Sequence, residues 1–438
     1  MTVTTRFAPS PTGLLHIGNL RAALLSWLTA RKAGGTFILR IDDTDAERSK
    51  EEYVEAAQRD LTWLGLTWDR FERQSERLER YEAAAQTWRE QGRLYASYET
   101  PQELDLKRKR QLAMGKHPVY DRSALSLSAE QLAAYEAEGR RPHWRFKLDQ
   151  ERVEWVDQIR GDTSVDCASV SDPVLIREDG GFLYTPCSVV DDIEMGVTHV
   201  VRGEDHVANT ATQIQMIQSL GGEVPTFAHH SLLVGAEGEA LSKRIGSLSL
   251  ESLAEEGLEP VAVLSLMARL GTADPVEPRT EHQALVDGFD IGRFGRAPAR
   301  FSMEELRQLN AKVLHETPYS AVSARLDALG VSEALWSAVR GNLERLEEAS
   351  EWAQLVENGA EPVIAEEDAE FVAQAMALLP ERPWDETTWK SWTDAVKSAS
   401  GRKGKALFMP LRKALTGRER GPEMAALLPL LENVPAAG

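Results

Sequence analysis

The chain has 438 residues, of which 42% are hydrophobic and 27% are charged, and its formal net charge is −19. This length exceeds one ordinary hydrophobic core, so we expect about two to four domains. No apolar run approaches the roughly 18 residues of a membrane helix, and no signal peptide fits before the first predicted strand. Cys167 and Cys187 are the only cysteines, which excludes a disulfide framework and favours the cytoplasm. The acidic charge excludes a surface that is basic throughout, so a nucleic-acid partner would require local clusters of positive charge.

The chain begins with a predicted strand over 2–8, a loop rich in Pro and Gly, and a predicted helix from about Gly18 to Lys32. Such a loop and helix N-terminus can bind an anion, because free backbone N–H groups point outward and the helix dipole favours negative charge. His16 lies where the loop meets the helix, so its ring can reach a phosphate. Gly18 presents no side chain that would block a nucleotide. The alternative is an ordinary strand-to-helix turn with a packed histidine.

A second strand is predicted over Thr36–Ile41, directly before the acidic run 42–45. Strand, helix and strand within about forty residues form a βαβ unit, which implies a parallel sheet with a right-handed crossover. Ligands of such sheets bind outside the carboxyl ends of the strands, so Arg6, Ser10 and Asp42 are expected at one rim. The alternative for the acidic run is that it only caps the next helix.

Two amphipathic helices are predicted next, over 49–64 and up to about residue 95. The segment Thr100-Pro101-Gln102-Glu103 is a capping box with proline at the first helical position, which predicts a helix start. This helix carries four consecutive cations, Lys107 to Arg110, which either contact a partner or face solvent. Strand signals then return over 174–177, 182–184, 188–190 and 198–202, and the helix from Asn209 to Leu220 has Asn209 or Thr210 as its expected N-cap. This second strand–helix unit is expected if one sheet is split by an insertion. Beyond residue 250 the pattern is helical, and no strand-rich stretch follows residue 320.

Three segments carry a family resemblance. The segment 6–19, RFAPSPTGLLHIGN, resembles the HIGH motif of class I aminoacyl-tRNA synthetases in its glutamyl-tRNA synthetase form. VVRGEDH at 200–206 is similar to a second segment of that family, and ALSKR at 240–244 resembles its KMSKS loop. The resemblance implies an α/β fold: a Rossmann-like parallel-sheet catalytic domain split by an insertion, then helical stem-contact and all-α anticodon-binding domains. The expected boundaries are 1–83 and 182–250 for the catalytic halves, 84–181 for the insertion that holds the tRNA acceptor end, 251–315 for the stem-contact region and 316–438 for the anticodon-binding region.

The same resemblance implies a glutamate–tRNA ligase that uses ATP, with Mg²⁺, to form glutamyl-adenylate and then charges tRNA(Glu), tRNA(Gln) or both. A guanidinium offers two parallel N–H donors to a planar carboxylate, so Arg202 favours glutamate as the substrate. The expected catalytic residues are His16 and Lys243. The expected ATP-binding residues are Pro9, Ser10, His16, Gly18, Asn19, Ser242, Lys243 and Arg244. The expected glutamate-binding residues are Arg6, Ala8, Ser10, Asp42, Tyr184, Ser188 and Arg202.

Several positions depart from the family pattern. Asp42 stands where the family usually has glutamate, and Ser188 stands where some members have asparagine. Ala240 replaces the first lysine of the KMSKS loop, which leaves the phosphate contacts of that loop to its remaining cations. Ser97 and Glu99 stand where some members carry the first pair of zinc ligands, so we expect no zinc and no other metal site in the protein.

Positive charge clusters near the end of the chain, where residues 401–420 contain seven Lys or Arg and one Glu. We expect this cluster to contact tRNA; the alternative is a solvated helix. The full set of expected tRNA contacts is Arg48, Lys107, Arg108, Lys109, Arg402, Lys403 and Lys405. We expect a cytoplasmic monomer. Two other functions stay open, a paralogue that glutamylates a tRNA base and resembles only the catalytic half, and a catalytically silent RNA-binding paralogue.

Overall fold

The computed structural model describes residues 2–239, 241 and 248–434. The chain divides into two compact units. The first unit comprises Met1–Leu253, Met267–Val276 and His282–Ser302, and the second comprises Ala254–Leu266, Glu277–Glu281 and Met303–Gly438. Within the described ranges, no helix is both long and apolar enough to cross a membrane.

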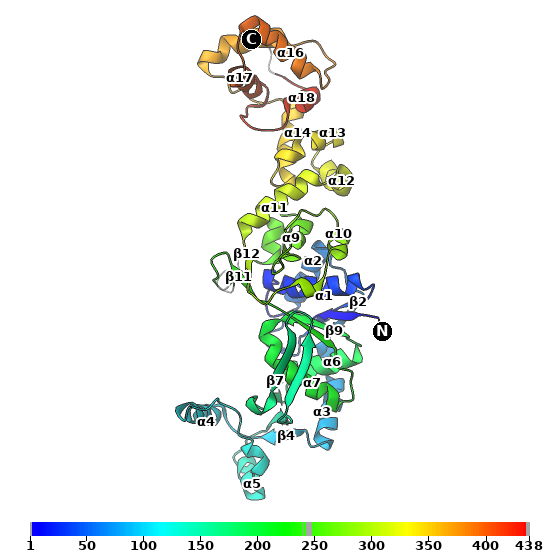
Figure 1. Cartoon of the computed structure of the whole chain (residues 1–438), viewed down its shortest axis with the longest axis vertical. Coiled ribbons are helices and arrows are strands. Elements are labelled where there is room, and N and C mark those ends of the chain that lie inside the picture. Colours follow the sequence, from blue (N-terminus) through cyan, green and yellow to red (C-terminus); the bar gives the residue numbers. More distant parts are fainter. Residues whose placement is uncertain (1, 240, 242–247, 435–438) are drawn as a thin grey trace. The chain divides into compact units, whose positions relative to one another are not determined.

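A parallel sheet forms the middle of the first unit (Figure 1). Strand β9 follows β1 across the sheet, since the Thr198 N–H donates to the Thr4 carbonyl at 3.0 Å. In the ladder between β9 and β10, Arg202 lies opposite His229. From one side to the other the strands are β3 (Arg70–Arg73), β2 (Thr36–Ile41) and β1 (Thr4–Phe7), which form one ladder, and then β9 (His199–Gly203) and β10 (Thr226–His230), which belong to a second. Their carboxyl ends therefore share one edge, as the βαβ pattern predicts.

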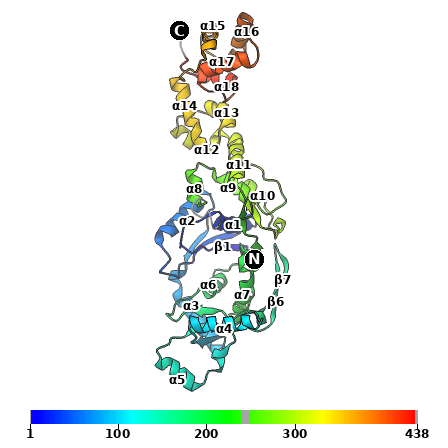
Figure 2. The same cartoon turned by 90° about the vertical axis from the view of Figure 1, so that its left-hand side faces the viewer.

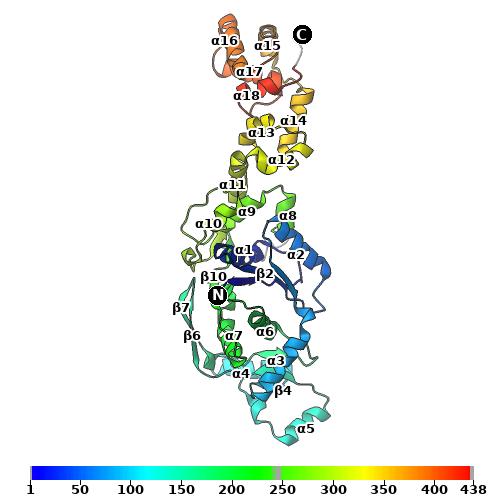
Figure 3. The same cartoon turned by 90° about the vertical axis from the view of Figure 1, so that its right-hand side faces the viewer.

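Helices cover both faces of this sheet. Helix α1 (Ile17–Lys32) lies on one face, and α6 (Tyr184–Glu194) and α7 (Val207–Ser219) lie on the other (Figures 1 and 3). The side chains of Leu20 and Leu24 in α1 have no exposed surface. The first unit also contains α2 (Glu51–Trp63), α3 (Leu78–Glu90), α10 (His282–Asp287) and the parallel pair β11 (Leu233–Gly235) and β12 (Ala299–Phe301).

We name the stretch between α3 and α6 the insertion, after the insertion expected over 84–181; that it holds the tRNA acceptor end stays a prediction. Its strands β4, β5 and β8 make an antiparallel sheet, while β6 pairs with β10 where Asp157 lies opposite Phe227. The predicted capping box is confirmed, because Thr100 Oγ1 accepts from the Glu103 N–H and the Glu103 carboxylate accepts from the Thr100 N–H. Helices α4 and α5 lie at the end of the unit away from α1 (Figure 2). The elements are β4 (Leu94–Ser97), α4 (Pro101–Ala113), α5 (Ala129–Ala137), β5 (His143–Phe146), β6 (Arg152–Asp157), β7 (Gly161–Asp166) and β8 (Val174–Ile176).

The strands predicted over 182–184 and 188–190 are wrong. Tyr184 begins helix α6, and the run from Pro186 to Asp192 within it is buried. A helix buried on all sides shows no polar stripe at a period of 3.6 residues, so its apolar residues are easily taken for a buried strand. The β-branched pair Val189 and Val190 adds to that impression.

The predicted N-cap of the next helix is also wrong. Helix α7 begins at Val207, and neither Asn209 nor Thr210 caps it. The Thr210 hydroxyl instead accepts a hydrogen bond from Arg202 at 2.7 Å. Strands β3 and β10 were not expected from the sequence, since they are only 4 and 5 residues long.

The second unit is helical, as predicted for the region after residue 320. Its core includes Trp336, Trp392 and Leu411, whose side chains are almost fully buried. From Met303 to residue 434, the described residues contain no strand. The bounds are α11 (Met303–Glu316), α12 (Tyr319–Ala328), α13 (Glu333–Val339), α14 (Ala349–Asn358), α15 (Ala369–Ala377), α16 (Thr388–Ser400), α17 (Lys405–Thr416) and α18 (Met424–Leu427), preceded in the chain by α8 (Leu250–Glu255) and α9 (Pro260–Met267).

Candidate active site

His16 caps the N-terminus of α1. Its Nδ1 accepts a hydrogen bond from the Gly18 N–H at 3.0 Å, and its own N–H donates to Asn19 Oδ1 at 3.1 Å. Burial lowers the pKa of the imidazole. The ring is therefore neutral, and Nε2 carries the hydrogen that it can donate to a ligand. Glycine at position 18 leaves room for this ring, because a Cβ there would lie 2.9 Å from His16 Cε1.

A hollow of about 490 Å³ lies beside this loop. Four of the predicted ATP-binding residues line it, namely Pro9, Ser10, His16 and Asn19. Tyr53 from α2 and Ser249 also line it, and sequence reasoning missed both. Ser249 is brought there by backbone pairing, in which Ile17 N–H donates to the Leu248 carbonyl and Leu250 N–H donates to the Leu15 carbonyl. The remaining predicted residues of the KMSKS-like loop, Ser242, Lys243 and Arg244, and the departure at Ala240 lie outside the described residues.

A buried cluster of charges lies at the carboxyl ends of β1 and β2. Arg40 binds both carboxylate oxygens of Asp42, at 2.7 and 3.2 Å, and donates to Asp192 at 2.9 Å. Arg6 donates to the same Asp192 oxygen at 3.0 Å. Burial raises the pKa of Asp42 to about 6, although Arg40 acts to lower it. Ser188 Oγ accepts a 3.4 Å hydrogen bond from Arg40, so three of the predicted glutamate-binding residues meet around this one guanidinium and its carboxylates.

Arg202 lies near this cluster, at the carboxyl end of β9. Only 6% of the residue is exposed. Its Nε donates to His229 Nε2 at 3.1 Å and its Nη2 donates to Thr210 Oγ1 at 2.7 Å. Its Nη1 is buried without a hydrogen-bond partner, and no carboxylate of the described residues accepts from this guanidinium. Burial lowers the pKa of Arg202, and the nearby Arg6 cation adds to that effect.

The other predicted glutamate-binding residues are Tyr184, Ala8 and Ser10. Tyr184 is the first residue of α6, and its ring centroid lies 5.9 Å from that of His206. Ala8 directly follows β1, and Ser10 lines the hollow beside His16. A buried cation with an unpaired N–H group is costly unless an anion completes it, so the arrangement is suited to bind a carboxylate at Arg202.

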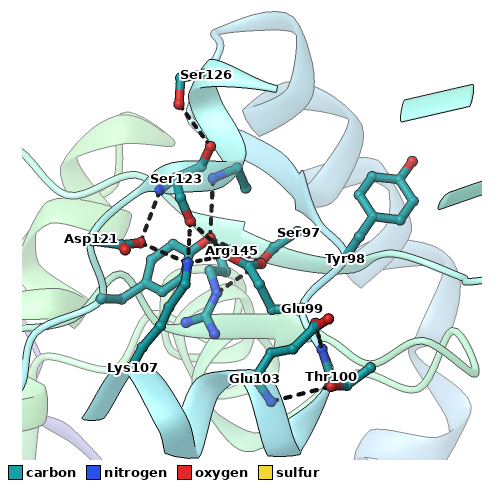
Figure 4. A network of polar contacts seen from close by, with 12 residues as sticks. Ser97, Tyr98, Glu99, Thr100, Glu103, Lys107, Asp121, Ser123, Ser126 and Arg145 are labelled. Atoms are coloured by element: carbon teal, nitrogen blue, oxygen red, sulfur yellow. Dashed lines mark hydrogen bonds and ion pairs between the residues drawn. The ribbon is translucent and has the colours of Figure 1, made fainter. Parts of the chain in front are cut away.

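The insertion contains a separate polar network centred on Glu99 (Figure 4). The Glu99 carboxylate accepts from the hydroxyls of Ser97, Tyr120 and Ser123 at 2.6 to 2.8 Å and from the Lys107 ammonium at 3.1 Å. Although burial acts to raise it, these hydrogen bonds bring the pKa of Glu99 down to about 2. Lys107 also pairs with Asp121 at 3.2 Å. The ammonium group of Lys107 is therefore bound within the insertion.

This network distinguishes Lys107 from its neighbour Arg108, which is exposed. We expect Lys107→Met to lower the free energy of unfolding by about 1–3 kcal/mol, because Glu99 loses a charged donor. We expect Arg108→Met to leave stability unchanged and to reduce tRNA affinity and its salt dependence. Thermal unfolding measures the stability of the two variants, and tRNA binding at two salt concentrations measures their affinity and its salt dependence. Equal stability losses in the two variants would contradict this assignment.

Three of the other cations predicted to contact tRNA have acidic partners within the protein. Arg48 pairs with Asp45 at 2.6 Å, Lys109 pairs with Asp105 at 2.7 Å, and Arg402 pairs with Asp368 and lies over the Phe371 ring. Lys403 and Lys405 are exposed. Their contacts with tRNA stay predictions.

No group of three or more His, Cys, Asp or Glu suited to hold a metal ion occurs in the parts of the chain that the structure describes. At the positions of the expected zinc ligands, the Ser97 hydroxyl donates a hydrogen bond to the Glu99 carboxylate. That the protein needs no zinc stays a prediction.

The comparisons with known proteins agree with this geometry. Residues 2–308 match the family model described as tRNA synthetases class I (E and Q), catalytic domain, and residues 314–433 match an anticodon binding domain. Glutamate–tRNA ligase 2 of Ruegeria sp. (strain TM1040) is 62% identical, covering 99% of this chain and 100% of the relative. Glutamate–tRNA ligase 1 of Paracoccus denitrificans is 60% identical, covering 99% and 100%. A glutamate–tRNA ligase structure from Elizabethkingia meningosepticum, described as in complex with its amino acid, has a TM-score of 0.84 at 26% identity, covering 98% of this chain and 97% of that chain.

The fold and the site thus define a class I aminoacyl-tRNA synthetase with a helical anticodon-binding region. Within that class, the chain belongs to the glutamate–tRNA ligase family. The predicted family, fold class and type of enzyme are confirmed. The full-length match also removes the basis for a paralogue that resembles only the catalytic half.

Proposed function

We propose that this protein activates glutamate with ATP and transfers the glutamyl group to the terminal ribose of tRNA. The choice of glutamate rests on Arg202. This cation is buried, its hydrogen-bonded partners are neutral, and its Nη1 has no hydrogen-bond partner. A side-chain carboxylate supplies the missing charge and accepts from Nη1. A glutamine amide supplies no charge, so the buried guanidinium favours glutamate.

In the first step an oxygen of the glutamate α-carboxylate attacks the α-phosphorus of ATP. The bond from that phosphorus to the bridging oxygen breaks, and pyrophosphate leaves. His16 donates from Nε2 to the phosphates, and the N-terminus of α1 adds a favourable dipole. Lys243 is proposed to stabilise the charge on the leaving group. Mg²⁺ accompanies ATP through the phosphate oxygens, which supply the hard ligands it prefers.

In the second step a ribose hydroxyl of tRNA attacks the acyl carbon, and AMP leaves with the bonding electrons. The contribution of the protein is positioning and electrostatic stabilisation, with no covalent enzyme intermediate. Lys403, Lys405 and Arg108 are exposed cations that support tRNA binding through its phosphates. We place the activity in the cytoplasm, where tRNA is charged, and propose a monomer.

Asp42 is proposed to bind the substrate ammonium group, and this predicts a pH dependence. The carboxyl has a pKa of about 6, so it becomes neutral as the pH falls through that value. We expect the KM for glutamate to rise below pH 6, by at most about tenfold per pH unit. The measurement is steady-state kinetics from pH 5 to 8. In Asp42→Asn the KM should be high at every pH, and a wild-type KM that is constant over this range would contradict the assignment.

The experiment that tests the proposed function is aminoacylation with labelled glutamate, run in parallel on tRNA(Glu) and tRNA(Gln). We expect charging of at least one tRNA, and the ratio of the two rates gives the tRNA specificity. Lys243→Ala should abolish the charging of both tRNAs. Absence of charging on both tRNAs, with protein that binds tRNA, would favour the catalytically silent paralogue instead.

A further inference from the structure

Three buried side chains from three strands form a chain of hydrogen bonds that ends at Arg202. Asp157 closes β6 in the insertion, His229 belongs to β10, and Arg202 belongs to β9. Asp157 Oδ2 lies 2.5 Å from His229 Nδ1, and His229 Nε2 lies 3.1 Å from Arg202 Nε. Asp157 and His229 are at most 2% exposed. The strand register fixes this arrangement, because His229 lies directly opposite Arg202 in the ladder.

The direction of each hydrogen bond follows from chemistry. The Asp157 carboxylate accepts from the backbone N–H groups of Ile159 and Arg160 and from that of His229. Burial acts to raise its pKa, but these bonds and the imidazole bring it to about 2. An ionised carboxylate can only accept, so His229 must donate from Nδ1. In a neutral ring Nε2 is then an acceptor, which matches the N–H that Arg202 Nε directs at it.

This order leaves Arg202 without a hydrogen-bonded anion while fixing the plane of its guanidinium. Burial lowers the pKa of His229, and the Arg202 cation adds to this effect, so the ring is neutral. Thr210 holds the Nη2 group through its hydroxyl oxygen, which is also neutral. A carboxylate in place of His229 would pair with the guanidinium and compete with an anionic ligand. A ring with hydrogen on Nε2 could donate to Thr210 Oγ1, 3.0 Å away, but it would also point its N–H at the Nε–H group of Arg202.

We propose that His229, held by Asp157 in the Nδ1–H tautomer, is a positioning residue that aims Arg202 at the side-chain carboxylate of the substrate. Through His229 and Arg202, Asp157 of the insertion thereby affects recognition of the amino acid. The inference rests on the proposed role of Arg202 in binding glutamate. It assigns no contact between the substrate and either His229 or Asp157.

A pair of substitutions at position 229 tests the inference. Glutamine can place an amide oxygen near the position of Nε2 and so keep an acceptor for Arg202. Asparagine is shorter, reaches only the position of Nδ1, and leaves Arg202 Nε without this partner. We expect the KM for glutamate to rise by about 10- to 100-fold in His229→Asn and Asp157→Asn, with a smaller rise in His229→Gln. The KM for ATP should change by less than about twofold in all three.

Two controls separate positioning from folding. Asp172 is a buried aspartate of the same insertion, where it binds Arg122 and Tyr95, and Asp172→Asn should lose stability without raising the KM for glutamate. In the wild-type protein, ¹⁵N NMR of labelled histidine reports the tautomer without any substitution. We expect the Nδ1–H form at His229 near neutral pH. An Nε2–H or doubly protonated ring would overturn the inference, as would equal KM values for His229→Asn and Asp172→Asn.

The result also separates this inference from the proposed function. If Arg202→Met leaves the KM for glutamate unchanged, the role of Arg202 itself is wrong. If Arg202→Met raises that KM while His229→Asn and Asp157→Asn do not, the role of Arg202 stands and only the inferred positioning chain fails.

Discussion

Arg202→Met is expected to reduce kcat/KM for glutamate by about 10²- to 10³-fold, or about 2.7–4.1 kcal/mol, which lies within the roughly 2–5 kcal/mol typical of a buried charge pair that loses one partner. Methionine fills a similar volume but supplies neither charge nor N–H donors. The substrate side-chain carboxylate would then enter a buried site without a cation. Most of the loss should appear as a higher KM, because the side chain does not change during the reaction.

The measurement is aminoacylation kinetics with glutamate varied at saturating ATP and tRNA. Arg122→Met is a suitable control, since Arg122 pairs with Asp172 in the insertion and is not part of the candidate site. We expect Arg122→Met to keep the KM for glutamate within about twofold. A KM in Arg202→Met that matches the wild type would show that another group binds the side chain.

Arg40→Met is expected to have the largest effect on stability. The Arg40 guanidinium is fully buried and lies within 3.6 Å of Asp42, Asp191 and Asp192. Among the residues that the structure describes, its loss leaves Arg6 and Arg77 as the cations paired with these buried carboxylates. Removal of one partner from a buried ion pair costs about 3–5 kcal/mol. We expect the unfolding transition of the first unit to move down by roughly 10 °C.

The loss of stability in Arg40→Met is expected to change with pH in one direction. Burial already raises the pKa of Asp42 above its unfolded value, and removal of Arg40 raises it further. A carboxyl with a raised folded-state pKa destabilises the protein above that pKa, and the cost disappears as the pH falls and the group protonates. The stability deficit of Arg40→Met should therefore shrink between pH 7 and pH 5. Calorimetry of both proteins across this range measures it, and a deficit that grows toward pH 5 would contradict the account.

The sequence predicted the elements that local chemistry determines. The strand over Thr36–Ile41 has the predicted bounds, and the capping box at Thr100 forms as its residues require. The loop from β1 to α1 was located through its Pro, Gly and His pattern, and α1 begins within one residue of the predicted start. These features depend on neighbours within a few positions, which a single sequence displays directly.

The contacts that complete the site were not predictable in this way. Arg6 and Asp192 are 186 positions apart in the chain, and Asp157 and His229 are 72 apart. No local pattern relates such residues, because strand order in the sheet brings them together. Asp157 sits in an ordinary β-hairpin sequence, and His229 belongs to a strand that was not predicted. The buried polar character of both becomes visible only when the fold is known.

The most direct test of the central claim is a crystal structure of the protein with a non-hydrolysable glutamyl-adenylate analogue. The account predicts that Arg202 Nη1 donates to the side-chain carboxylate of the ligand at about 2.8 Å, while Nε stays on His229. The nucleotide should lie in the hollow beside His16. A ligand whose side-chain carboxylate binds another group, with Arg202 Nη1 still unpaired, would contradict the proposed basis for selecting glutamate.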